Sequence, residues 1–250
     1  MAKQLYDYWF VQFDFPNAEG KPYKSSGGKM VWNETLKREI PEGWEVKSIN
    51  NITDIYRGVT YTSSDVVDKN MNSILVLRGN NIDNDHLVYD SNVAYIPKSM
   101  ISEEQHINKN DIIITMSSGS KEHVGKCTMF HSDSKHTYGA FLSKIVPLET
   151  CPYFTFSFLK SSYCKTKIKS ICSGTGINNL NNKTFDDLKF AFPPSNVLEK
   201  FENKLNPIYG RIGVNDLQSL LLTAQRDNLL PLLMNGQVTV TQLNSDLSAR

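Results

Sequence analysis

The chain has 250 residues, of which 40% are hydrophobic and 21% charged, values that are ordinary for a soluble globular protein. They exclude a disordered, a collagen-like and a membrane-spanning chain, since no run of 18 apolar residues occurs. The N-terminus lacks the basic-then-apolar order of a signal peptide, so we expect a cytoplasmic protein. The cysteines form no C-x-x-C pair, which argues against a zinc knuckle or a disulfide framework and favours idle thiols at Cys127, Cys151, Cys164 and Cys172.

The net charge of +1 hides an uneven distribution of charge along the chain. Residues 41–115 carry 6 basic and 11 acidic side chains, whereas residues 116–170 carry 8 basic and 3 acidic ones. A basic stretch of this kind is suited to face nucleic-acid phosphates. The alternative is that its lysines solvate the outer face of a helix, because several of them, Lys165 and Lys167 included, fall in a segment with a helical pattern.

The first 40 residues are expected to form a short helix and a linker. Within residues 3–15, Leu5, Tyr8, Trp9 and Phe13 recur at helical spacing, which predicts an amphipathic helix. Pro16 ends it. Residues 16–40 collect Gly, Pro and Ser without apolar periodicity, so we expect a surface linker there.

Residues 41–195 are expected to form a mixed α/β domain. Short runs of β-forming residues predict strands at residues 45–49, 74–77, 111–116, 124–130, 141–146 and 189–192. Pro152 opens an aromatic segment, residues 153–171, that fits one helix with Phe154, Phe158 and Ile168 facing inward and its lysines outward.

Residues 196–236 have the pattern of a long helix. Apolar residues step by three or four from Val197 to about Leu233, which is the spacing of a coiled coil. We expect a kink or break where poor helix residues fall, at Pro207, Gly210 and Gly213. The sequence Asn235-Gly236 is typical of a C-terminal cap, and a frayed polar tail, residues 237–250, follows it. The predicted fold class is therefore α+β, with a mixed α/β domain between residues 1–40 and a long helix.

Two segments resemble a known family, the specificity subunits of type I restriction–modification enzymes. One is RDNLLPLLMNGQV at residues 226–238, which is similar to the family's C-terminal signature. The other is LYDYWFVQFDFP at residues 5–16, followed by GKPYKSSGGKM at 20–30 and IPEGW at 40–44, which looks like the family's central conserved region. The resemblance implies a half-length subunit with one target-recognition domain instead of two.

The resemblance also implies partners and a mode of assembly. Family members direct a modification (methyltransferase) subunit and a restriction subunit to a bipartite site in double-stranded DNA. S-adenosylmethionine, ATP and Mg²⁺ would then be bound by the partner subunits only, and this chain would need no cofactor. Conserved helices hold two recognition domains apart, so a chain with one domain would pair as a homodimer through its coiled-coil helix.

DNA contacts are expected from four segments that look like the family's loops, residues 55–61, 77–82, 116–121 and 173–180, together with the basic stretch. Glycine admits a close phosphate, hydroxyls donate hydrogen bonds, and arginine or asparagine pairs bidentately with base edges. The predicted DNA-binding residues are Arg57, Tyr61, Arg78, Asn80, Ser117, Ser118, Ser120, Lys121, His123, Lys126, Lys165, Lys167, Thr175 and Asn178. The alternative is that the glycine, serine and asparagine residues only form turns, and that residues 173–180 cap a helix.

Partner contacts are expected on the two helices. The predicted residues are Tyr8, Trp9, Phe13, Phe201, Leu205, Leu220, Leu221, Leu229 and Leu230. They would bind a second copy of the chain and the modification subunit. The alternative is that they pack in the core of their own chain.

No catalytic motif is recognised in the sequence. Phe192-Pro193-Pro194-Ser195 lacks the amide and the aromatic residue of an adenine methyltransferase loop, and the five histidines show no metal-ligand spacing. We therefore expect a non-catalytic subunit without a metal site. Two alternatives stay open: a self-sufficient DNA methyltransferase or nuclease with an unusual site, and a monomeric remnant of a two-domain specificity subunit.

Overall fold

The computed structural model describes residues 1–83, 86–88, 93–171 and 178–237, and it divides the chain into two compact units, Met1–Ile208 and Tyr209–Arg250. No helix among these described residues is long and apolar enough to cross a membrane. The first unit holds every strand named below, and a single helix, α5 (Ser195–Met234), begins in the first unit and continues into the second.

A four-stranded antiparallel sheet forms the centre of the first unit, in the order β11–β9–β13–β4. Its strands are β4 (Thr53–Arg57), β9 (Ile112–Thr115), β11 (Cys127–Met129) and β13 (Leu142–Pro147). Three consecutive isoleucines make β9 fully buried on both faces, because a β-branched run of this kind suits a strand that is covered from two sides.

A three-stranded sheet lies beside it, in the order β12–β5–β8. It contains β5 (Ser73–Leu77), β8 (Ala94–Pro97) and β12 (His136–Tyr138), and β12 runs parallel to β5. Leu77, Ile113, Tyr138 and Leu142 join the two sheets in one hydrophobic cluster. The sheets also approach through the backbone, since a Cβ on Gly58 would lie 2.2 Å from the carbonyl oxygen of Gly139.

Short elements complete the strand count of the described residues. Two-stranded pairs are β6 (Ile82–Asp83) with β7 (His86–Leu87), β10 (Ser117–Ser118) with β14 (Asn178–Asn179), and β15 (Lys189–Phe192) with β3 (Glu45–Ser48). Single 3₁₀ turns are η2 (Ile49–Asn51), η3 (Ser63–Asp65), η4 (Gly79–Asn81), η5 (Lys98–Met100) and η6 (Glu103–Gln105).

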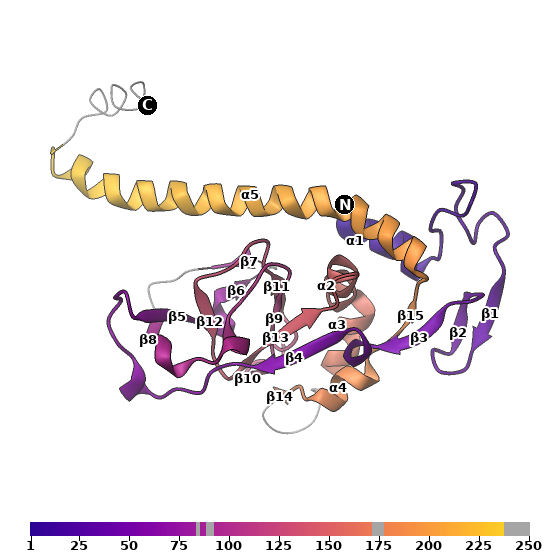
Figure 1. The fold of residues 1–250 in the computed structure, drawn as a ribbon, viewed down its shortest axis with the longest axis horizontal. Helices are drawn as coiled ribbons and strands as arrows, with labels where there is room; N and C mark the ends of the chain where they lie inside the picture. Colours follow the sequence, from indigo (N-terminus) through magenta and orange to yellow (C-terminus); the bar gives the residue numbers. More distant parts are fainter. Residues whose placement is uncertain (84–85, 89–92, 172–177, 238–250) are drawn as a thin grey trace. The chain divides into compact units, whose positions relative to one another are not determined.

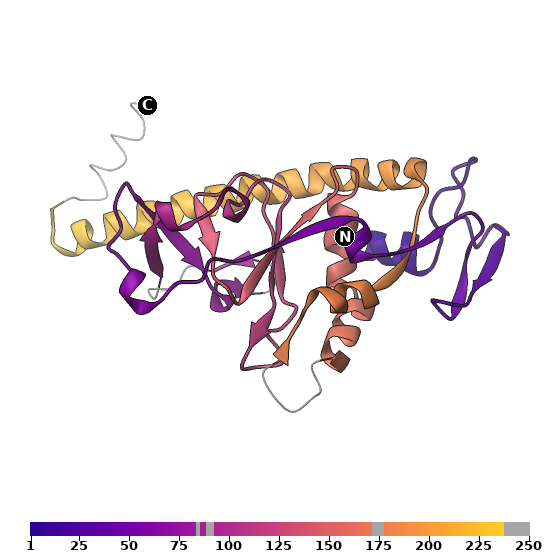
Figure 2. The same cartoon turned by 60° about the horizontal axis from the view of Figure 1, so that its bottom comes forward.

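The aromatic segment forms two helices instead of the single predicted one. These are α2 (Pro152–Lys160) and α3 (Ser162–Ile171), and they lie between the sheets and the β3–β15 pair (Figures 1 and 2). Ser161 breaks the helix because its backbone is extended, and its hydroxyl accepts the N–H of Cys164 at 3.2 Å as an N-terminal cap. The predicted inward residues Phe154, Phe158 and Ile168 are buried. A short helix, α4 (Asn182–Asp187), follows and is capped by Asn181.

The N-terminal region differs from the predicted helix and linker. The helix is α1 (Ala2–Tyr6), continued by a π-helical turn, η1 (Asp7–Val11). The predicted linker contains an antiparallel hairpin of β1 (Met30–Asn33) and β2 (Arg38–Pro41). Its turn is held by Asn33, whose side-chain oxygen accepts the N–H groups of Thr35 and Leu36, so turn chemistry hid two strands from a reading by composition.

Helix α5 is assigned without interruption from Ser195 to Met234, so the break that we considered at Pro207, Gly210 and Gly213 is absent. A proline removes one intrahelical hydrogen bond, and the neighbouring turns are retained by buried Phe201, Leu205 and Tyr209. The predicted cap is confirmed: Gly236 has a φ of +65°, and its N–H donates to the carbonyl of Leu233 at 3.1 Å. The predicted frayed tail lies outside the described residues except for Gln237.

Candidate nucleic-acid interface

The ends of several strands bring together four loops, which we call the loop cluster: residues 57–66, 78–79, 116–118 and 139–142. Hydrogen bonds of the backbone hold these loops to one another. The carbonyl of Phe141 accepts the N–H groups of Met116 at 2.9 Å and Ser117 at 3.2 Å, and Gly139 donates to the carbonyl of Leu77 at 2.9 Å. The cluster therefore stands on the rigid edges of both sheets, a placement that is typical of recognition loops.

A cavity of about 550 Å³ opens within the loop cluster. Its lining includes Tyr61, Arg78, Gly79 and Phe141. The Nε of Arg78 donates to the Tyr61 hydroxyl at 2.8 Å, and its guanidinium carbon lies 5.8 Å from the centre of the Tyr61 ring. The phenyl ring of Phe141 is 70% exposed. The cavity thus combines a positive charge, hydroxyl groups and an aromatic face, which are the groups that contact DNA bases.

Several predicted DNA-binding residues meet at this cluster. Arg57 is exposed at the end of β4, Tyr61 and Arg78 line the cavity, and Ser117 and Ser118 are half-buried in β10. Asn80 is exposed in η4, two residues after Arg78. They are separated by up to about 60 residues in the sequence and converge because β4, β5 and β9 end at the same place.

The predicted basic residues form a second group beside the cluster, on the loop of residues 119–126 and on α3. The exposed residues are Ser120, Lys121, His123, Lys165 and Lys167. The two segments pack together, since a Cβ on Gly125 would lie 3.0 Å from the Cδ1 of Ile168. Their charge is partly compensated: Lys126 lies 3.6 Å from Asp83, and Lys169 lies 2.9 Å from Glu122.

One lysine that contributes to the basic excess of residues 116–170 does not reach the surface. Lys144 is 3% exposed, and its Nζ lies 3.3 Å from Asp111 and donates to the carbonyl of His106 at 2.7 Å. Burial raises the pKa of Asp111, against the lowering effects of the N–H of Asn108 and of Lys144. The charge count along the sequence therefore overstates the positive charge that is available to DNA.

Two predicted DNA contacts cannot be placed. Thr175 lies outside the described residues, and only the backbone of Asn178 is described, in β14 opposite Ser118. This pairing puts the end of the loop of residues 173–180 next to β10. The two open interpretations of that loop, DNA contact and helix cap, stay as they were, although Asn181 just beyond it does cap α4 by accepting the N–H of Thr184 at 3.0 Å.

The predicted partner contacts divide into buried and exposed residues. Trp9, Phe13, Phe201 and Leu205 are at most 2% exposed inside the first unit, and the rings of Trp9 and Phe201 lie 5.7 Å apart. Their prediction as a binding surface is wrong, because an amphipathic stripe looks the same whether its own chain or a partner covers it. Tyr8 is 38% exposed, Leu229 is half-buried, and the remaining three are exposed: Leu220, Leu221 and Leu230.

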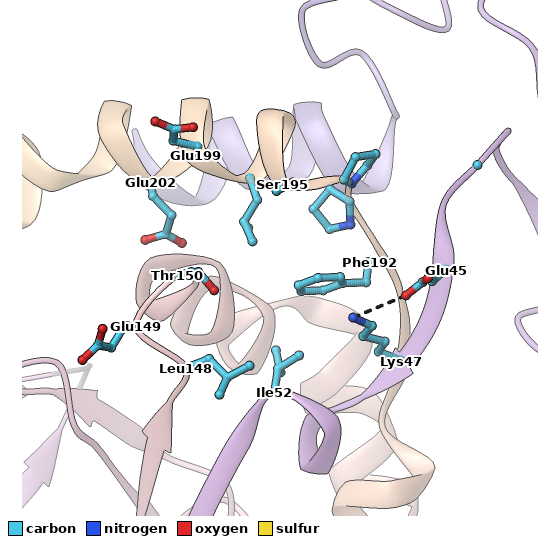
Figure 3. Close-up of a pocket in the computed structure, with 14 residues that line it drawn as sticks. Glu45, Lys47, Ile52, Leu148, Glu149, Thr150, Phe192, Ser195, Glu199 and Glu202 are labelled. Carbon is cyan, nitrogen blue, oxygen red and sulfur yellow. Dashed lines mark ion pairs between the residues drawn. The ribbon is translucent and has the colours of Figure 1, made fainter.

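A larger cavity, of about 780 Å³, lies between the start of α5, the start of α2 and the β3–β15 pair (Figure 3). Four glutamates line it, Glu45, Glu149, Glu199 and Glu202, with Lys47 as the one basic lining residue. The Nζ of Lys47 lies 3.4 Å from Glu45 and 4.2 Å from the centre of the Phe192 ring. This negative lining disfavours phosphate, so we place the DNA-facing surface at the loop cluster.

Glu202 joins two helices in this cavity. Its carboxylate accepts the backbone N–H groups of Phe154 at 2.8 Å and Tyr153 at 3.1 Å, at the N-terminus of α2. Burial raises the pKa of Glu202 to about 7, although both hydrogen bonds oppose that change. The side chain thus supplies from α5 the cap that Cys151, the residue before α2, does not provide.

We expect Glu202→Ala to lower the free energy of unfolding by about 1–3 kcal/mol, since it leaves two N–H groups without their acceptor. With a pKa of about 7 in the folded chain against an ordinary 4.5, the folded state holds this proton more tightly. The stability gained is complete below pH 4.5 and is lost as the pH rises through 7. Urea unfolding from about pH 5 to about pH 8 checks this, with Glu202→Gln as the variant that cannot titrate. Parallel pH profiles for the wild type and Glu202→Gln would contradict it.

Catalytic and metal-binding groups are scarce in the described part of the chain. No group of three or more His, Cys, Asp or Glu side chains in it is arranged to hold a metal ion. Cys127, Cys151 and Cys164 are free and buried, and burial raises the pKa of the Cys151 thiol to about 11, which makes it a poor nucleophile. Cys172 lies outside the described residues.

Comparison with known proteins decides the family. The model of the type I restriction modification DNA specificity domain matches residues 41–207. The chain belongs to this family. It is 32% identical over 208 residues to the Type I restriction enzyme EcoKI specificity subunit of Escherichia coli K12, which covers 80% of the chain and 44% of that subunit. It is 29% identical over 214 residues to the StySPI specificity subunit of Salmonella potsdam, covering 83% of the chain and 46% of that subunit.

A solved structure agrees on the fold. The HsdS subunit from Thermoanaerobacter tengcongensis superimposes with a TM-score of 0.51 at 13% identity, over 87% of the chain and 45% of that subunit. The predicted α+β class with a long C-terminal helix is thereby confirmed. The chain spans slightly less than half the length of the curated specificity subunits named above. The predicted membership of this family, in a form with one specificity domain, is confirmed as well.

Phe141 is the member of the loop cluster that the sequence did not indicate. We predicted a strand over residues 141–146, whereas the structure begins β13 at Leu142 and leaves Phe141 on the preceding turn. An aromatic residue at the start of an apolar run is read as part of that run. The neighbouring Gly139 is the only local signal that a turn ends there.

Proposed function

We propose that the chain is a DNA sequence-recognition subunit of a type I restriction–modification complex and performs no chemistry alone. The observation that carries this proposal is the loop cluster, where Arg57, Tyr61, Arg78, Ser117 and Ser118 converge from separate strands. Bidentate donors and hydroxyls on rigid strand ends are suited to read base edges, and the adjoining lysines are suited to bind phosphates. Membership of the specificity family supports the same function.

The proposed partners are double-stranded DNA, a modification subunit and a restriction subunit, all in the cytoplasm. S-adenosylmethionine, Mg²⁺ and ATP would be bound by those subunits. The domain organisation that we propose is an N-terminal conserved segment (1–40), a target-recognition domain (41–195), a conserved helix (196–236) and a polar tail (237–250). The family model, which matches residues 41–207, supports the central part of that division.

We expect selection from a pool of random duplexes to test this function. The chain is mixed with its modification subunit, bound duplexes are recovered, and the pool is sequenced. Two short constant segments at a fixed separation should emerge, since the complex reads a split site. The free chain, incubated with S-adenosylmethionine, Mg²⁺ and ATP, should neither methylate nor cleave the selected duplex. A recovered pool without any common sequence would overturn the proposal.

The proposed assembly is a homodimer through the later part of α5. Exposed apolar side chains there include Val214, Leu217, Leu220, Leu221, Leu222 and Leu230. A helix rarely leaves so many leucines exposed unless another surface covers them. Because the chain spans about half the length of its relatives, a second copy would supply the other recognition domain. A two-fold axis would then relate two identical half-sites.

Changing the length of α5 should change the spacer of the DNA site. We expect one heptad inserted into its later part to lengthen the helix by roughly 10 Å, or about three base pairs at ~3.4 Å each, while the half-sites stay the same. Sequencing of the selected duplexes measures both quantities. The control replaces seven residues of the same segment without changing its length. An unchanged spacer with altered half-sites would refute the role of the helix as a spacer.

A further inference from the structure

Phe141 is held in place by its backbone while its side chain is open to solvent. It occupies a tight turn in which the N–H of Leu142 donates to the carbonyl of Gly139 at 2.8 Å. Its own carbonyl accepts two N–H groups from the turn after β9. The phenyl ring is nevertheless 70% exposed. An aromatic ring on a fixed backbone needs little ordering on binding, so it is a preorganised contact for a flat ligand.

The cavity beside the ring has the size and the polar groups of a base-binding site. Its volume of about 550 Å³ lies within the range of small-molecule sites and exceeds what one base requires. Arg78 and Tyr61 form one wall, and the hydroxyl-bearing residues Thr60, Thr62 and Ser63 contribute to the lining. Guanidinium and hydroxyl donors match the acceptor atoms on base edges, while the Phe141 ring matches the base face.

We propose that this cavity receives a single nucleobase displaced from the DNA duplex, with Phe141 stacked on its face and Arg78 at its edge. This inference rests on the proposed function, because it assumes that the loop cluster faces DNA. A base within the duplex is covered on both faces by its neighbours, so it meets an aromatic ring inside a cavity only after it leaves the stack. Binding here serves recognition, and no covalent step is involved.

Displacing a base costs less where the base pair is already weakened. A short duplex with one central mismatch should therefore bind more tightly than the same duplex with a matched pair, by roughly tenfold. The register does not need to be known, because the protein settles where the mismatch meets the cavity. Fluorescence anisotropy with the purified full chain gives both dissociation constants.

Phe141→Ala should bring the two dissociation constants together, and Phe141→Trp, which keeps an aromatic face, should retain the preference for the mismatch. Trp32→Ala is the matched control, since Trp32 is 59% exposed on β1, away from the loop cluster, and its loss should leave the preference intact. Equal binding of both duplexes by the wild type, or an unchanged preference in Phe141→Ala, would overturn this inference alone. Failure of the wild type to bind any duplex would overturn the proposed function and this inference with it.

Discussion

Replacing Lys144 with methionine is expected to lower the free energy of unfolding by about 3–5 kcal/mol, because it leaves the Asp111 carboxylate buried without its ion pair. Both side chains lie in the central sheet and are 3% exposed. The Lys144 ammonium also lies 5.3 Å from the centre of the Tyr56 ring on β4. Since β9 and β13 support the loop cluster, this variant should also weaken DNA binding through loss of folded protein.

The double variant Lys144→Met with Asp111→Asn tests the cause. Removing both charges should recover most of the lost stability, while asparagine keeps an acceptor for the N–H of Asn108, which donates to Asp111 at 2.8 Å. Urea unfolding of the wild type, both single variants and the double variant completes the cycle. A loss below about 1 kcal/mol in Lys144→Met would show that the pair is as weak as a surface ion pair.

Replacing Lys121, Lys126, Lys165 and Lys167 together with glutamine is expected to weaken DNA binding and its dependence on salt. Each lost phosphate contact reduces the slope of log K against log salt by about 0.9, so four contacts reduce it by about 3.6. Anisotropy titrations between about 50 and 200 mM salt measure this slope.

The control removes the same charge from the N-terminal region through Lys21, Lys24, Lys29 and Lys37, which are exposed. Its slope should stay close to that of the wild type. If both variants lose the same slope, the effect reflects net charge and not a located interface. If neither changes, the lysines of α3 and of the loop of residues 119–126 only solvate the domain.

Much of the fold could be predicted from local pattern. All six predicted strands are present, since runs such as the isoleucines of β9 are apolar and β-branched over several residues. The missed elements have weak local signals. The polar strand His136–Tyr138 gains its place by parallel pairing with β5, and the strand Thr53–Arg57 is half-exposed. Ser161 divides the aromatic helix through its backbone conformation, which composition does not show.

The candidate site was predictable by residue type but not by geometry. Arginine, serine and lysine in glycine-containing loops indicated DNA contacts, whereas the convergence of Arg57, Arg78 and Ser117 depends on strand pairing across the sheets. Long-range pairing is not encoded in any single segment. For the same reason, the sequence could not separate Phe201, buried against Trp9, from Leu221, exposed on the same helix.

The central claim is that this chain selects the DNA sequence on which a partner acts. The most direct test is the methylome of cells that express the chain with its modification subunit, compared with cells that express the modification subunit alone. We predict adenine methylation at one split sequence that appears only when the chain is present, with two identical halves in inverted orientation if the chain forms a homodimer. Unlike halves would contradict the homodimer. A methylation pattern that is the same with and without the chain would contradict the recognition function itself.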